Sequence, residues 1–199
     1  MAYSYTKRKR KRHGNNMKDQ TKRLIAYLNL LGVKIDSDSF ASRIRAQKLA
    51  YIIQKIIDKQ LYDDFNFYIK GPYSPELARE YFSSRDDFAN GNSDYKPINE
   101  EYEELERVKP LLGSLSQTDL EIVASLLFLR KERGLDENQA ETELLERKPH
   151  LKIENIWKGS TIIKKLFLTE KLRDAIMASL KEETEEWDSA SNESLRQFE

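Results

Sequence analysis

The segment FYIKGPYSPEL, residues 67–77, combines the groups in this chain that are best suited to hold a ligand. Ser74 followed by Pro75 is typical of a helix start, where free backbone N–H groups attract a carboxylate or a phosphate. Lys70 adds a positive charge nearby, and Glu76 adds a carboxylate in the first helical turn. One hypothesis is therefore an enzyme or small-ligand site that uses Lys70, the helix start at Ser74, and Glu76.

The same segment is also suited to contact another protein. Its two tyrosines offer large side chains that lose little conformational entropy on binding. Gly71 can adopt a positive φ and Pro72 fixes the next φ, so we expect a sharp Gly-Pro turn between a strand and the helix. In the alternative interpretation this is only a rigid corner, and the tyrosines are packing residues. The predicted partner-binding residues are Tyr68, Lys70, Gly71, Pro72, Tyr73, Ser74 and Glu76.

A second candidate site is a run of six consecutive cations near the start of the chain, namely Lys7, Arg8, Lys9, Arg10, Lys11 and Arg12. Such a run binds nucleic acid, acts as a targeting signal, or is a solvated tail without a specific role. The remaining residues include 28 basic and 34 acidic side chains, so the body of the protein is not a basic surface. Any affinity for nucleic acid is therefore expected to come from this arm.

Sequence patterns of the common catalytic and metal sites are absent. The seven glycines form no phosphate-binding loop, no serine lies in a G-x-S-x-G pattern, and the two histidines form no H-E-x-x-H motif. Cysteine is absent, which excludes disulfides and thiolate metal sites. We therefore expect no catalytic residues, no metal and no cofactor, and we predict that the protein is not an enzyme.

Composition places the chain among cytoplasmic globular proteins. It has 199 residues, of which 39% are hydrophobic and 34% are charged. No apolar run approaches the roughly 20 residues that cross a bilayer, and no signal peptide is recognisable, so we expect no membrane contact. The oligomeric state is left open.

Periodicity and capping signals predict a mostly α-helical fold, a single domain of about seven or eight helices with a small β-strand or hairpin near residues 65–70. We divide the chain into a disordered basic arm (1–17), a helical domain (18–187) and an acidic flexible tail (188–199). The helices are expected at residues 18–31, 39–59, 74–88, 99–112, 116–133, 136–147, 153–166 and 169–187. A strand is expected at 65–69, and a turn-rich loop or hairpin tip at 89–97.

Two features of these helices concern the core and the surface. The helix containing residues 120–129 is apolar nearly all round, which predicts that it is the central buried helix. Trp157 and Trp187 are either partly buried packing residues, which we expect, or exposed residues of an interface, and the sequence does not choose between the two.

Four segments, in order, resemble one family. They are QKLAYIIQK (47–55), FNFYIKGPYSPEL (65–77), LEIVASLLFLRKE (120–132) and ERKPHLKIENI (146–156). Over residues 20–180 the chain is similar to the YwgA-like bacterial and archaeal proteins. More remotely, the first two segments resemble the SocA-like Panacea antitoxin domains, although Lys70 to Ser74 depart from the Panacea pattern at the corner. The resemblance implies a mostly helical module that works through protein–protein contact.

These observations favour a non-enzymatic protein-interaction module, regulatory or antitoxin-like, that contacts an unidentified protein partner through the corner. The alternative is a nucleic-acid-associated protein that uses the basic arm at residues 7–12.

Overall fold

The computed structural model describes residues 17–168 and the isolated positions 172, 175, 178–181, 184 and 187. The predicted basic arm, except for Met17, and the predicted acidic tail lie outside the described residues. So does most of the helix predicted at 169–187.

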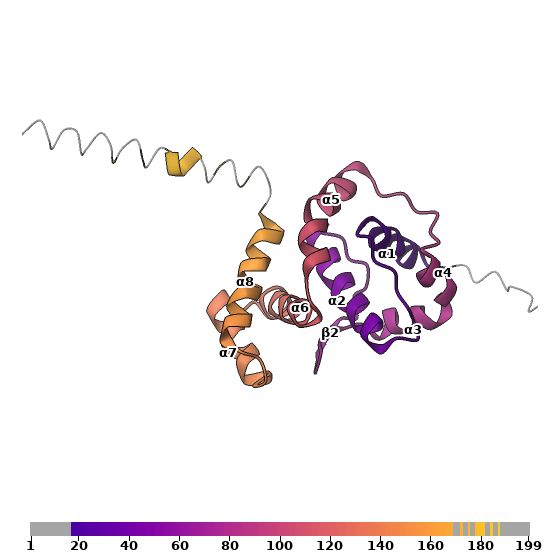
Figure 1. The fold of residues 1–199 in the computed structure, drawn as a ribbon, viewed down its shortest axis with the longest axis horizontal. Helices are drawn as coiled ribbons and strands as arrows, with labels where there is room; N and C mark the ends of the chain where they lie inside the picture. Colours follow the sequence, from indigo (N-terminus) through magenta and orange to yellow (C-terminus); the bar gives the residue numbers. More distant parts are fainter. Residues whose placement is uncertain are drawn as a thin grey trace, which may run out of the picture.

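The described chain is mostly helical with one small sheet, which confirms the predicted fold class. The elements follow the order α1 (Asp19–Leu30), α2 (Phe40–Ile56), β1 (Asn66–Tyr68), β2 (Gly71–Tyr73), α3 (Pro75–Ser83), α4 (Arg85–Asn90), α5 (Asn99–Ser114), α6 (Gln117–Glu132), α7 (Glu137–Arg147) and α8 (Ile153–Phe167). Figure 1 shows α7 and α8 on one side of α6, with α1, α2, α3 and α4 on the other.

Helix α6 is the central helix, as its composition predicts. Every residue from Asp119 to Leu129 is buried, and the helix packs against α2, α7, α8 and β2. Ser116 begins it with a capping box, because its hydroxyl accepts the N–H of Asp119 at 3.1 Å while the Asp119 carboxylate accepts the N–H of Ser116 at 3.2 Å. The local signal therefore sets the start of the helix, and the apolar circumference places it in the middle of the core.

The β element is a hairpin, and its geometry corrects the predicted turn. Strands β1 and β2 pair antiparallel, with Phe67 opposite Pro72 and Tyr68 opposite Gly71. The turn is therefore at residues 69–70 and not at Gly71-Pro72, which belong to the second strand. Pro72 is tolerated in a strand of a two-stranded sheet because both strands are edges.

The helix predicted over residues 74–88 is two helices, α3 and α4. The backbone of Ser84 leaves the helical region with φ −115° and ψ 36°, and its carbonyl accepts the N–H groups of Asp87 and Phe88 to begin the next turn. Serine favours such boundaries because its side chain competes for backbone hydrogen bonds. The following loop contains no strand in the described structure, so the hairpin predicted as one possibility at 89–97 is wrong.

None of the described helices is both long and apolar enough to cross a lipid bilayer.

Candidate functional site

The seven residues predicted to bind a partner have three different positions in the structure. Tyr68, Lys70, Gly71 and Tyr73 line a cavity between the hairpin, α2 and α3. Ser74 and Glu76 instead make contacts that hold the start of α3 in place. Pro72 is buried, and its carbonyl accepts a hydrogen bond from Lys48. The structure therefore brings four of the seven together around one cavity.

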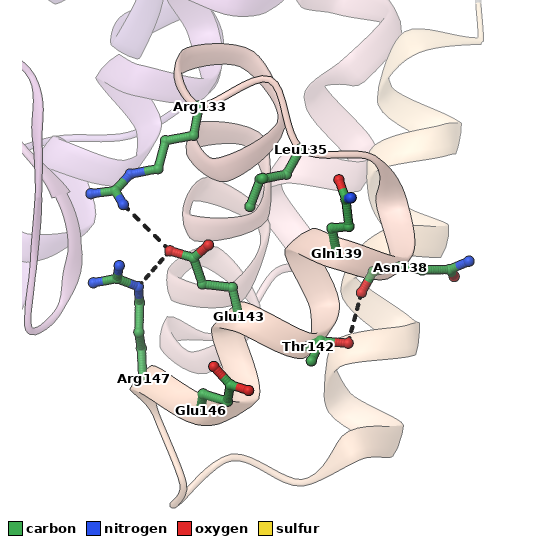
Figure 2. Close-up of a pocket in the computed structure, with 8 residues that line it drawn as sticks. All are labelled: Arg133, Leu135, Asn138, Gln139, Thr142, Glu143, Glu146 and Arg147. Atoms are coloured by element: carbon green, nitrogen blue, oxygen red, sulfur yellow. Dashed lines mark hydrogen bonds and ion pairs between the residues drawn. The ribbon is translucent and has the colours of Figure 1, made fainter.

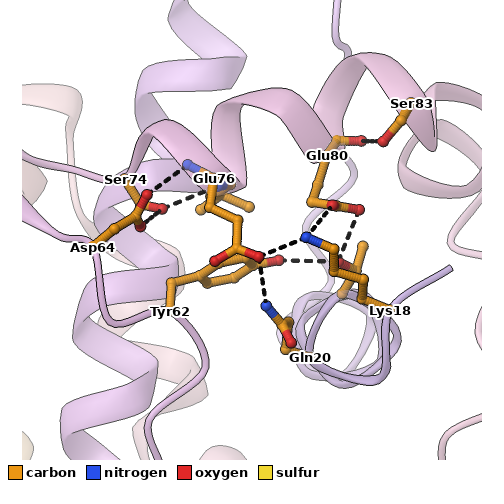
Figure 3. A network of polar contacts seen from close by, with 10 residues as sticks. Lys18, Gln20, Tyr62, Asp64, Ser74, Glu76, Glu80 and Ser83 are labelled. Carbon is orange, nitrogen blue, oxygen red and sulfur yellow. Dashed lines mark hydrogen bonds and ion pairs between the residues drawn. The ribbon is translucent and has the colours of Figure 1, made fainter.

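An internal carboxylate already occupies the start of α3. The Ser74 hydroxyl accepts the N–H of Leu77 at 3.0 Å and donates to Asp64 Oδ1, and Asp64 Oδ2 accepts the N–H of Glu76 at 2.7 Å (Figure 3). The anion site that the sequence predicts at this helix start is thus real, but the protein fills it with its own aspartate. The backbone groups predicted to receive an external carboxylate or phosphate are already bonded.

Glu76 belongs to a network that ties α1 to α3. Its Oε1 accepts from Lys18 at 2.6 Å and from Gln20 at 3.0 Å, and Lys18 also lies 3.2 Å from Glu80 (Figure 3). Asp63, Asp64 and Glu76 place carboxylate oxygens within 4.8 Å of one another. Since protein donors already bind two of these carboxylates, the cluster gives no argument for a metal ion.

The cavity beside the hairpin has a volume of about 430 Å³, which is within the range of small-molecule binding pockets. We call it the corner groove and define it by its lining residues. They are Phe40, Arg43, Ile44, Gln47 and Lys48 from α2, Tyr68, Ile69, Lys70, Gly71 and Tyr73 from the hairpin, and Ala78, Tyr81 and Phe82 from α3.

Large apolar side chains at the mouth of the corner groove are exposed to solvent. Ile69 is 86% exposed at the hairpin turn, Phe40 is 66% exposed and Phe82 is 62% exposed. The guanidinium of Arg43 lies over both phenylalanine rings, 5.7 Å and 5.8 Å from their centres. Three separate elements therefore present an apolar rim to solvent around a concave centre.

Two polar residues of α2 hold β2 in place beneath this rim. The side chain of Gln47 donates to the Ser74 carbonyl at 3.0 Å and accepts the Ser74 N–H at 2.8 Å. Lys48 Nζ donates to the Pro72 carbonyl at 2.6 Å, and its side chain is only 1% exposed. Burial lowers the pKa of Lys48 to about 7, helped by repulsion from Lys148 and opposed by Glu121.

Lys48 is part of a charged cluster between the hairpin and α6. Glu121 accepts from Lys148, and the second oxygen of Glu121 lies 4.0 Å from Lys70 Nζ. Burial also lowers the pKa of Lys148, although its bond to Glu121 opposes this shift. Ser125 lies beside the cluster under Gly71, and its buried hydroxyl has no hydrogen-bond partner among the described residues.

Reasoning from the sequence did not assign the α2 and α3 walls of the groove or the lysine cluster. The residues missed are Phe40, Arg43, Lys48, Phe82, Glu121 and Lys148. One signal was present, because Gln47-Lys48 sets two polar side chains in a helix that is otherwise apolar from Ala46 to Ile53. Polar residues inside a buried helix need partners, and such partners mark a site or a structural contact.

A wide, shallow hollow along α7 has a different character (Figure 2). Its charged groups pair with one another, since Glu143 lies 3.4 Å from Arg133 and 2.7 Å from Arg147. Mutual neutralisation leaves little charge to recognise a ligand, so we place no function there.

The other sequence-predicted features are placed as follows. The cations at residues 7–12 lie outside the described residues. Trp157 is 57% exposed on α8 and Trp187 is 78% exposed, so of the two alternatives that the sequence left open, the structure favours exposed tryptophans over packing residues.

Comparison of the chain with models of protein families, with curated proteins and with solved structures finds no significant match.

Proposed function

We propose that this protein is a non-enzymatic protein-interaction module that contacts a partner protein through the corner groove. The observation that carries the proposal is the exposed apolar rim, formed by Phe40, Ile69 and Phe82 around a concave centre. Contiguous exposed apolar surface costs solubility unless a partner covers it, and buried aromatic anchors contribute most of the binding energy in protein interfaces.

The polar groups at the corner support a binding role over a catalytic one. Ser74 and Asp64 accept hydrogen bonds from the backbone of α3, and Glu76 accepts one from Gln20 of α1, so each has a structural task. The resemblance to antitoxin domains favours a regulatory or antitoxin-like task for the module.

Affinity capture with a double variant tests the proposal. Ile69→Asp with Phe82→Ser removes apolar surface at two exposed positions, so the fold should be unaffected. The full-length variant is expected to lose partners that the wild-type protein retains. Tyr102→Ser, a change at a 48% exposed aromatic residue on α5 that does not line the groove, is the matched control and is expected to retain them.

The opposite result would count against the corner groove. If the double variant unfolds at the wild-type temperature and still captures every partner, the groove is not the contact surface.

A second candidate function rests on the six consecutive cations at residues 7–12. An arm that neutralises about six phosphates gives a slope of roughly −5 when the logarithm of duplex DNA affinity is plotted against that of salt concentration. Deletion of residues 1–16 is expected to abolish this slope. An unchanged slope after the deletion would exclude the arm as a nucleic-acid contact.

A further inference from the structure

The floor of the corner groove has more positive than negative charge. Lys48 and Lys70 line the groove, and Lys148 and the carboxylate of Glu121 lie behind this lining. Lys148 binds this carboxylate directly, and Lys70 lies 4.0 Å from it. Lys48 has no carboxylate within hydrogen-bonding distance among the described residues and donates only to the Pro72 carbonyl.

Hydrogen-bond donors at this floor are also short of acceptors. An ammonium group has three donors, and the described structure gives Lys48 one partner. Tyr81 lines the groove, is 1% exposed, and its hydroxyl has no partner in the described part of the chain. Buried polar groups without partners destabilise the protein. Because Lys48 and Tyr81 are already desolvated in the folded protein, a ligand that supplies acceptors here would not have to strip water from them, and it would bind more tightly for that reason.

The side chains that line the groove indicate the chemical character of the rest of the ligand. The lining residues include no aspartate or glutamate. Apart from Gln47 and the cations Arg43, Lys48 and Lys70, they are apolar or aromatic. A ligand matching these walls has a large apolar part next to an anionic part.

The extent of the rim favours a chain segment over a small molecule. Ile69 is 86% exposed at the hairpin turn, so a molecule that fills only the cavity would leave it in water. A segment that crosses the groove covers the rim and fills the centre together.

We infer that the corner groove binds a short segment of the partner protein in which an aspartate or glutamate neighbours a large apolar residue. This inference rests on the proposed function. The apolar side chain lies against the exposed rim of Phe40, Ile69 and Phe82, and the carboxylate lies toward Lys48 and Lys70. The carboxylate supplies the negative charge and the acceptor that the groove floor lacks.

Peptide selection on the intact protein tests this assignment. A library of random twelve-residue peptides is selected against the full-length chain, and the best binder is synthesised with its acidic residue intact or changed to the matching amide. We expect the selected peptides to share an acidic residue beside a large apolar one. The amide is expected to bind at least about tenfold more weakly.

Variants of the protein then locate the carboxylate. Lys70→Gln changes a half-exposed side chain and should leave the fold intact, whereas Lys48→Met tests the buried ammonium. In each variant, the acid-to-amide change in the peptide is expected to lower the affinity by a smaller factor than it does with the wild-type protein. A double-mutant cycle measures this difference directly. Affinity for the acidic peptide is also expected to fall as the pH rises from 7 to 9, because Lys48 loses its proton in this range.

The outcomes separate this inference from the proposed function. Peptides that need Ile69 and Phe82 but show no acidic preference, or that bind equally well as amides, overturn the inference and leave the groove as an interface. Peptides that bind the Ile69→Asp, Phe82→Ser variant as tightly as the wild-type protein overturn both the inference and the proposed function. Failure to enrich any peptide overturns the inference alone, because a folded partner surface could still occupy the groove.

Discussion

The close approach of the hairpin to α6 predicts the effect of replacing Gly71 with alanine. A Cβ at this position would lie 2.6 Å from Ser125 Oγ and 3.5 Å from the Glu121 carbonyl oxygen. The backbone also has φ +87°, a conformation that residues with side chains rarely adopt. Gly71→Ala therefore adds a steric clash to an unfavourable backbone conformation.

The chain contains a control that separates these two costs. Gly32 has φ +71°, and a Cβ there would meet no atom within 4 Å. Gly32→Ala is thus expected to lower the free energy of unfolding by about 1–2 kcal/mol, the cost of the backbone conformation alone. Gly71→Ala is expected to lower it by about 2–5 kcal/mol, because overpacking a well-filled site adds roughly 1–3 kcal/mol.

Urea unfolding of the two variants measures the difference, and Ser125→Ala identifies its source. The Ser125 hydroxyl is buried without a partner in the described structure, so its removal should cost little by itself. In the Ser125→Ala background, Gly71→Ala is expected to cost about 1 kcal/mol less than in the wild-type protein.

Equal losses for Gly71→Ala and Gly32→Ala, within about 0.5 kcal/mol, would refute this reasoning. The hairpin would then not pack closely against α6 in solution, and the corner groove would have a different shape.

Three further predictions concern charged and capping groups. The pKa of Lys48 is about 7 in the folded protein and 10.5 in its ordinary state. Between these pH values the unfolded chain therefore binds more protons than the folded protein does. The free energy of unfolding should therefore rise from pH 7 to pH 9, by about 1 kcal/mol per unit, and Lys48→Met should flatten this rise in urea titrations. Burial opposes ionisation of Glu101, but hydrogen bonds, beginning with that from Lys59, outweigh it and lower the pKa. Glu101→Gln should therefore cost about 2 kcal/mol at pH 7, and the difference from wild type should shrink as the pH falls below about 4; a constant difference would contradict the shift. Ser74→Ala removes the cap of α3 and should lower the melting temperature through a loss of about 1 kcal/mol, whereas Ser114→Ala at an exposed position should change it little.

Local signals in the sequence were sufficient to place most helices. The starts at Ser39, Ser74, Ser116 and Asp136 agree with the structure, because each capping bond joins residues only three positions apart. The central position of α6 also followed from composition, since a helix without a polar face is stable only when it is surrounded.

Short-range patterns were insufficient where a few residues decide the structure. The hairpin has two three-residue strands, so the position of its turn depends on how β2 packs against α2 and α6. The break at Ser84 likewise interrupts a stretch whose apolar spacing suits one continuous helix.

The character of the site was decided by contacts between distant parts of the chain. Asp64 reaches the start of α3, which turns a predicted anion site into an internal cap. Lys48, Lys70, Glu121 and Lys148 meet although they lie on four different segments, and only the packing of α2, the hairpin, α6 and the end of α7 brings their charges together. Sequence alone therefore determined the helices, their caps and the segment that forms the corner, because those depend on neighbours along the chain. The tertiary structure decided which face of the corner is open and what charge lies beneath it, because burial and electrostatic interactions depend on neighbours in space.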